Sequence, residues 1–268
     1  MYNVDLLEHK FAKIGARLKG AGDSARRFAP ESGVVLDVRS DREGEFFEVL
    51  GREGGPAEVE VLDVQPRDRH LLLLVRREAG KQKFLCGHDE RHWFVAAIPE
   101  SAPVGTVRAA KEALKPPEVR EAQARQGLDA RRGNRRKNAA NRRQGEWFFL
   151  PAPGLQVDPK LVLRGEPIRR GGGKAHWCEN LYRTGGRSVH VCRRHPNGVD
   201  GATYRRILMD DPDARSWDWR IMVRDAQVYA RGRISHPDHR TITLHGWHRV
   251  VMNTETQAVA MRNVAFLD

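Results

Sequence analysis

The sequence predicts an α+β protein, in which an N-terminal helix and an antiparallel sheet precede a second, mainly β domain with a His/Cys-rich hairpin. Three observations lead to this prediction. The chain opens with apolar residues that recur at helical spacing. The strand-like segments that follow are separated by intervals too short for crossover helices, which favours antiparallel pairing. Finally, seven of the eleven histidines fall between positions 176 and 248, which marks the second half as chemically distinct.

The N-terminal helix is predicted from apolar residues that recur every three or four positions: Val4, Leu7, Phe11, Ile14 and Leu18. Gly20 and Gly22 are expected to end it. Six strand-like segments follow, bounded by Gly, Pro, Asp and Glu: 34–38, 45–50, 58–64, 71–76, 83–86 and 93–98. Residues 104–114 then predict a helix that Pro116 and Pro117 stop.

The charge distribution predicts three regions. Residues 1–117 carry 19 Lys/Arg and 19 Asp/Glu, residues 118–145 carry 9 and 3, and residues 146–268 carry 19 and 13. The net charge of +12 therefore comes from the middle and the second half. We expect a neutral α+β domain over 1–117, a basic linker over 118–145 that is helical to about 128 and loose beyond, and a basic β-rich domain over 146–268.

The middle region contains a run of seven cations without an anion: Arg131, Arg132, Arg135, Arg136, Lys137, Arg142 and Arg143. Such a run repels itself as a free coil and attracts polyanions. Arg-rich segments can also order on RNA, so nucleic acid, and RNA rather than DNA, is the expected partner of these seven residues. A solvated flexible linker is the alternative interpretation.

The second domain is expected to begin with a buried strand over 144–151 and to continue with strands over 189–192, 241–244 and 250–252. A short helix is predicted over 202–209, with Asp200 as its N-cap. The run from Gly171 to Lys174 lacks the spacing of a phosphate-binding loop, so it predicts a flexible turn.

A metal site is predicted at five residues that alternate His and Cys: His176, Cys178, His190, Cys192 and His195. Gly185 and Gly186 suggest a hairpin turn that would place Cys178 opposite Cys192. Two thiolates and two imidazoles at one hairpin would suit tetrahedral Zn²⁺. Packed free thiols and a disulfide are the other interpretations.

A second histidine group follows and supplies four candidates for catalysis or metal binding: His236, His239, His245 and His248. Asp238 could orient His236 or His239. In the first domain, Cys86 precedes His88 and His92, which could form a nucleophile with its base, a metal half-site, or only a polar hairpin connection.

The stretches 143–151 and 229–255 resemble a loosely defined group of uncharacterised bacterial and phage-associated proteins. The matching features are an Arg-Gln-Gly-Asp/Glu opening and an ending of the form His-x2-His-x2-Ile-x-Leu-x2-Trp-His-x-Val. This chain departs from the group in its cysteines and in the helical stretch at 201–210. The resemblance implies a discrete second domain and no particular activity.

These observations predict a two-domain, nucleic-acid-binding protein with a structural zinc site. The alternatives are a metal- or His-dependent phosphodiesterase-type hydrolase and an interaction subunit that docks a partner through residues 1–117. The longest aliphatic run, 71–75, is far shorter than the ~20 residues that span a bilayer, so no membrane role is expected. Three cysteines and an N-terminus unlike a signal peptide favour a cytoplasmic location.

Overall fold

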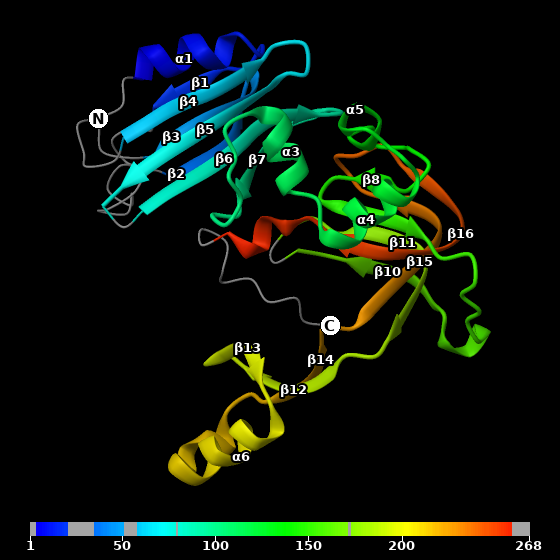
Figure 1. Cartoon of the computed structure of the whole chain (residues 1–268). Helices are drawn as coiled ribbons and strands as arrows, with labels where there is room; N and C mark the ends of the chain where they lie inside the picture. Colours follow the sequence, from blue (N-terminus) through cyan, green and yellow to red (C-terminus); the bar gives the residue numbers. More distant parts are fainter. Residues whose placement is uncertain (1–3, 21–34, 51–57, 79, 171–172, 259–268) are drawn as a thin grey trace. The chain divides into compact units, whose positions relative to one another are not determined.

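The computed structural model describes residues 4–20, 35–50, 58–78, 80–170 and 173–258 (Figure 1). An N-terminal helix precedes mainly antiparallel sheets, and the predicted α+β class is confirmed. The chain divides into two compact units, Met1–Asn138 with Asn253–Met261 and Ala139–Met252 with Arg262–Asp268. Residues 118–138 of the expected linker belong to the first unit, and residues 139–145 belong to the second.

The first unit contains two small sheets whose strands lie close to the predicted segments. The bounds are α1 Val4–Ala12, β1 Leu18–Gly20, β2 Val35–Asp41, β3 Gly44–Leu50, β4 Glu58–Gln65, β5 His70–Arg77, β6 Gly80–Asp89 and β7 His92–Ile98. One sheet has the order β1-β3-β2 and the other β4-β5-β6-β7. All these pairs are antiparallel except β1 with β3. Position 34 of the first predicted strand, 34–38, lies outside the described residues.

Strand β5 is buried on both faces, and each face packs against a different apolar cluster. Leu71 and Leu73 belong to the core cluster that also contains Phe11 and Phe47. Leu72 faces the other way, into a cluster with apolar residues of β7 and α3. Since successive side chains of a strand point to opposite faces, one continuous apolar run serves both clusters.

The N-terminal helix is shorter than predicted, because α1 ends at Ala12. The amide N–H groups of Ile14 and Ala16 both donate to the Phe11 carbonyl, which turns the chain out of the helix. Leu18 is buried as part of β1, which pairs with β3. The apolar stripe therefore predicted the burial of Leu7, Phe11, Ile14 and Leu18 correctly, but it overstated the length of the helix.

Most of the predicted linker is folded into the first unit. Its helices are α3 Val107–Ala113, α4 Pro117–Arg125 and α5 Ala130–Gly133. The buried Gln123 side chain accepts a hydrogen bond from Lys115 Nζ at 2.9 Å and donates to the Gly133 carbonyl at 2.9 Å. Arg136 pairs with Asp89 and Glu90 at the β6–β7 turn. These contacts tie residues 115–136 to the sheet, so this part is not loose.

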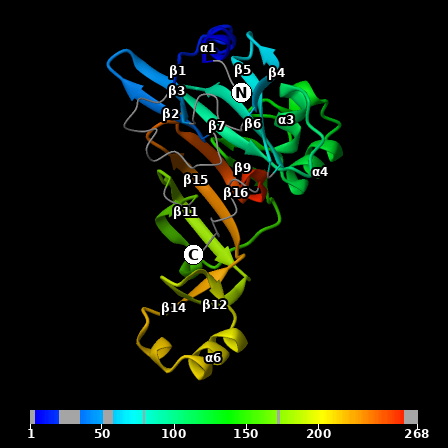
Figure 2. The same cartoon turned by 90° about the vertical axis from the view of Figure 1, so that its left-hand side faces the viewer.

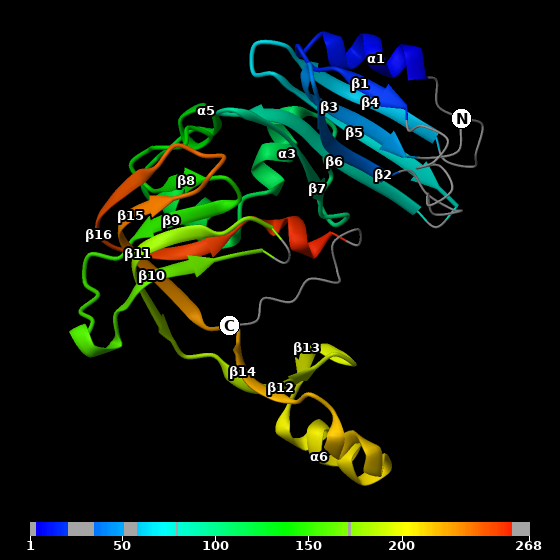
Figure 3. The ribbon, with the colours of Figure 1, turned by 180° about the vertical axis from the view of Figure 1, so that it is seen from behind.

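The second unit is built on a six-stranded antiparallel sheet of order β10-β11-β15-β16-β9-β8 (Figures 2 and 3). The strands are β8 Arg142–Gln144, β9 Trp147–Pro151, β10 Leu163–Ile168, β11 His176–Thr184, β15 Gln227–Ser235 and β16 Ile242–Met252. Phe149, Leu181, Ile234 and Leu244 are almost fully buried in its core. Gly171 and Gly172 of the predicted glycine turn lie outside the described residues.

The predicted hairpin at Gly185 and Gly186 is wrong. Strand β11 pairs with β15 and ends at Thr184, opposite Gln227. Beyond the two glycines the same antiparallel register resumes in β12 (Arg187–Cys192) and β14 (Arg220–Arg224), with Arg187 opposite Arg224. The chain therefore continues in its direction at the glycines, and the two ladders form one interrupted ribbon.

Residues 187–224 form the outer part of this ribbon, and we call them the arm. The arm contains β12, β13 (His195–Val199), α6 (Gly201–Asp210), a 3-10 turn (Pro212–Ser216) and β14. Helix α6 matches the prediction for 202–209, and the Asp200 carboxylate caps it by accepting the Thr203 N–H at 2.7 Å. A Cβ at Gly186 (φ +82°) would lie 2.6 Å from Val223 Cγ1, which explains a glycine at this crossing.

Candidate metal centre

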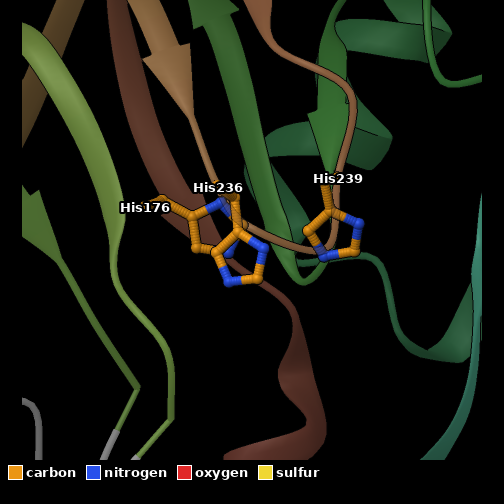
Figure 4. Close-up of side chains that lie close together, drawn as sticks. All are labelled: His176, His236 and His239. Atoms are coloured by element: carbon orange, nitrogen blue, oxygen red, sulfur yellow. The ribbon is translucent and has the colours of Figure 1, made fainter.

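Three histidines meet at one end of the six-stranded sheet (Figure 4). His176 begins β11, whereas His236 and His239 belong to the connection between β15 and β16. One ring nitrogen from each residue lies within 4.8 Å of the others. The ring centroids of His176 and His236 are 4.1 Å apart, and those of His236 and His239 are 4.6 Å apart. This group could hold a metal ion.

The sheet register brings these histidines together although sixty residues separate them. Trp177 in β11 is opposite Ser235 in β15, so His176 lies beside the point where β15 ends. His236 follows that end directly, and the chain returns into β16 with Ile242 opposite Ile234. Antiparallel pairing thus places the start of one strand beside the exit of its neighbour.

Gln144 fixes the orientation of His176. The Gln144 amide NH₂ donates to the carbonyls of Arg240 at 2.8 Å and Ile234 at 3.3 Å. Its oxygen must therefore face His176 Nδ1, which lies 3.0 Å away and donates. A histidine whose Nδ1–H is held in this way offers the Nε2 lone pair, as metal-binding histidines do.

His176 Nε2 faces the carboxylate of Glu146. Its distance to Glu146 Oε2 is 3.6 Å, and the His176 side chain is only 1% exposed. Two groups that both offer lone pairs at this distance require a cation between them, either a proton or a metal ion. Ligand atoms of a tetrahedral zinc ion, each about 2.0–2.1 Å from the metal, lie about 3.3 Å apart, so an ion held by His176 Nε2 would lie close to the Glu146 carboxylate.

His236 is held from both sides of its ring. Asp238 N–H donates to Nδ1 at 3.1 Å, and the Lys174 carbonyl accepts a hydrogen bond from the same imidazole. The proton of the neutral ring is then on Nε2. The lone pair of Nδ1 accepts the hydrogen bond from the Asp238 amide, and a bound metal ion would use this lone pair instead. A backbone carbonyl that orients a ligating histidine is the usual second partner at metal sites.

His239 packs against the hairpin turn between β8 and β9. A Cβ at Gly145 would lie 2.8 Å from His239 Nε2 and 3.3 Å from His176 Cε1. Burial, together with the neighbouring His236 and His176, lowers the pKa of His239 to about 4, and burial likewise lowers the pKa of His236. Both rings are therefore neutral at pH 7, which is the form that binds metals.

Glu146 stays ionised beside these rings. Burial on its own would raise its pKa, but when the His176 ring is protonated its hydrogen bond and charge, together with the charge of Arg170, outweigh burial and lower the pKa below its ordinary value. A carboxylate that remains charged in a half-buried position next to three imidazoles favours a divalent cation there and can accept a proton from water bound to that cation.

Gly145→Ala should destabilise the second unit by about 2–3 kcal/mol. Gly145 has φ +57° in a two-residue hairpin turn, and a left-handed alanine costs about 1–2 kcal/mol before any collision with His239 is counted. Urea unfolding followed by tryptophan fluorescence measures the loss. Gly154→Ala is the matched control, since a Cβ there meets nothing within 4 Å; equal stability loss in both variants would contradict this packing.

The sequence-predicted metal set is not assembled. Cys178 is opposite Glu166 and Ile234 rather than Cys192, and burial raises the pKa of its thiol to about 12. Cys192 pairs with His195 within the arm. Of the five predicted ligands, only His176 joins a group of three potential ligands in the part of the chain that the structure describes. All three cysteines are free and buried.

The second histidine group is divided. His236 and His239 enter the centre, whereas His245 is exposed on β16 and His248 is buried there with its Nδ1 3.0 Å from the Gly246 carbonyl. His190, from the predicted metal set, stacks on Tyr204 with ring centroids 3.8 Å apart. These three histidines therefore lie outside the centre.

The Cys86 group is a hairpin connection, one of the interpretations that the sequence allows. Cys86 is fully buried and burial raises the pKa of its thiol. His88 packs edge-on against Trp93, and His92 Nδ1 lies 2.6 Å from Glu45 Oε1. The two histidines thus contact other side chains and leave the thiol in the core.

Sequence patterns did not indicate Gln144, Gly145 and Glu146 as functional residues. They are consecutive, and each contacts a different part of the centre: Gln144 orients His176, Gly145 admits His239, and Glu146 faces His176 Nε2. The signal was available, since the Arg-Gln-Gly-Glu opening of the second domain carries the resemblance described above. The Arg-Gln-Gly-Glu pattern by itself predicts only the opening of a strand.

The seven cations of the middle region are not equivalent. Arg131, Arg132, Arg135 and Lys137 are exposed, whereas Arg136 is half-buried against two carboxylates. Arg142 and Arg143 belong to β8; Arg142 donates to the Thr243 carbonyl at 2.7 Å, and burial lowers the pKa of Arg143. Four of the seven remain accessible to a polyanion.

No protein-family model, curated protein or solved structure matches this chain. Among the described residues, no helix combines the length and apolar character needed to cross a membrane.

Proposed function

We propose that this protein is a metal-dependent hydrolase whose centre is formed by His176, His236 and His239, with Zn²⁺ as the ion. The observation that carries the proposal is the approach of His176 Nε2 and Glu146 to 3.6 Å beside two further imidazoles. Three protein nitrogens leave one position of a tetrahedral ion for water, which is the pattern of catalytic zinc sites.

Glu146 is the proposed general base. Its side chain is 23% exposed, in contrast to the buried His176, so it lies between the core and solvent. A bound zinc ion would supply a Lewis acid and lower the pKa of its water to about 7. Glu146 would accept the proton of that water, while Gln144 keeps His176 in the orientation that the chemistry needs.

The surroundings of the centre favour an anionic substrate, and a phosphodiester is the class that we propose. Arg170 acts electrostatically on Glu146, and Lys174 pairs with Asp238 at 2.8 Å next to His236. The half of the chain from 146 onward carries 19 Lys/Arg against 13 Asp/Glu. Positive charge beside a hydrolytic centre attracts the substrate and stabilises the charge that develops on phosphoryl oxygens.

Glu146→Gln tests the role of the base. With the zinc-loaded protein and bis-p-nitrophenyl phosphate, the variant should lose about 100-fold or more of kcat, since general bases contribute about 10²–10⁴-fold. Its zinc affinity, measured by chelator competition, should stay within about threefold of wild type. Glu166→Gln on β10, outside the centre, should leave both quantities unchanged.

Two outcomes would contradict the assignment. If Glu146→Gln loses zinc as well as turnover, Glu146 is a metal ligand rather than the general base. If the zinc-loaded wild type releases no p-nitrophenol above the buffer rate while it binds the ion, the centre does not act on phosphodiesters.

A further inference from the structure

The arm, residues 187–224, has a composition that the metal centre does not explain. Eight of its residues are arginine, none is lysine or glutamate, and five are aspartate. Six of the arginines are exposed or stack on a ring, and none of the six makes an ion pair with a carboxylate among the described residues: Arg193, Arg194, Arg205, Arg206, Arg215 and Arg220.

The aspartates of the arm are mostly engaged with the backbone. Asp200 caps α6, and Asp211 caps the 3-10 turn by accepting the Asp213 N–H at 3.0 Å. Asp218 accepts the Arg193 N–H at 3.2 Å. These carboxylates therefore stabilise turns and helix starts, and the guanidinium groups are left to face solvent or a partner.

Planar side chains stack beside these arginines. His195 stacks on Trp219, with ring centroids 5.6 Å apart and planes at 10°, and on Trp217 at 6.0 Å. The Arg194 guanidinium lies over the Trp217 ring, 4.4 Å from its centroid. A guanidinium that lies over an aromatic ring extends the stack and presents a further face to which a base can add.

We propose that the arm binds single-stranded nucleic acid, with the exposed arginines on the phosphates and the Trp217–Arg194 stack against the bases. Phosphate groups accept the forked hydrogen bonds of arginine, and aromatic platforms hold bases of any sequence. The absence of lysine and the ordered rings distinguish this surface from a basic patch that attracts any anionic surface. The arm lies apart from the metal centre in the sequence, and we expect the arm, rather than residues 131–143, to be the principal contact.

The test compares two variants that each remove four exposed charges. In one, Arg193, Arg194, Arg205 and Arg206 are changed to Gln; in the other, Arg131, Arg132, Arg135 and Lys137 are changed to Gln. Binding of fluorescein-labelled 20-nucleotide RNA and DNA strands is followed by anisotropy between 50 and 300 mM salt. EDTA is present throughout, so the state of the metal centre does not affect the result.

The arm variant should bind at least about tenfold more weakly, and the slope of log K against log salt should fall by about 0.7 for each lost phosphate contact. The middle-region variant should stay within about threefold of wild type. Trp217→Leu, with all charges intact, should weaken binding by about 5- to 100-fold at an unchanged salt slope, because stacking is lost and phosphate contacts are not.

Several results would overturn the inference. One is equal affinity of the arm variant and wild type; another is loss of binding in the middle-region variant alone. Binding to phosphatidylserine vesicles without binding to either strand would identify the arm as a membrane contact. Circular dichroism of each variant confirms that the fold is kept, which is expected because the changed arginines are exposed.

Discussion

His239→Gln should lower the affinity of the protein for Zn²⁺ by more than about 100-fold. The expectation follows from the geometry of the centre, in which His239 supplies one of three nitrogens within 4.8 Å. Loss of groups that merely orient a ligand already costs about 10–100-fold in metal affinity, so loss of a ligand costs more. Chelator competition at pH 7.5 measures the affinity, and His236→Gln should behave in the same way.

Cys192→Ser and His195→Gln are the matched controls, because the hairpin predicted from the sequence would make both residues ligands. The structure places them in the arm, opposite each other and outside the centre, so both variants should keep wild-type zinc affinity. Loss of zinc in either control, with retention in His239→Gln, would restore the sequence-based site and refute the one proposed here.

The metal-free second unit should lose stability as the pH falls from about 6.5 to about 4. His239 has its pKa lowered from 6.5 to about 4 in the folded protein, and the pKa of His236 is also lowered. The unfolded chain therefore binds protons in this range before the folded chain does, so acid favours unfolding. After allowance for partial exposure, His239 alone should account for about 2 kcal/mol.

Urea unfolding of metal-free protein at a series of pH values measures this loss. The slope of the unfolding free energy against pH, between pH 6.5 and 4, should be clearly smaller in His239→Gln, whose side chain does not titrate. Glu146 contributes little over most of this range, since its pKa is lowered from 4.5 and the stability that it contributes is lost only as the pH falls below about 4.5. An identical slope in wild type and variant would show that His239 titrates normally in the fold.

Local patterns predicted the first unit well. The alternation and turn residues between 35 and 98 identified six strands, and the apolar spacing of Leu7, Phe11 and Ile14 identified buried residues. The predictions fail where the strands that pair with each other are far apart in the sequence. Gly185 and Gly186 have the local chemistry of a hairpin turn, but the strand that pairs with β11 begins at Gln227, more than forty residues later.

The centre was half predictable for the same reason. His176, His236 and His239 were each singled out, in two separate groups, because local spacing cannot show that the start of β11 lies beside the end of β15. The role of Gln144 depends on which carbonyls its NH₂ group meets, and Ile234 and Arg240 are about ninety residues away. Long-range register therefore defines the site, and spacing alone does not.

X-ray absorption of the zinc-loaded protein tests the central claim, that three histidines and no cysteine hold the ion. The account predicts one zinc per chain with a first shell of nitrogen and oxygen at about 2.0–2.1 Å and the outer-shell scattering of imidazole rings. A zinc–sulfur distance of about 2.3 Å would show that a thiolate such as Cys178 is a ligand. That result, or a protein that takes up no zinc, would contradict the centre described here.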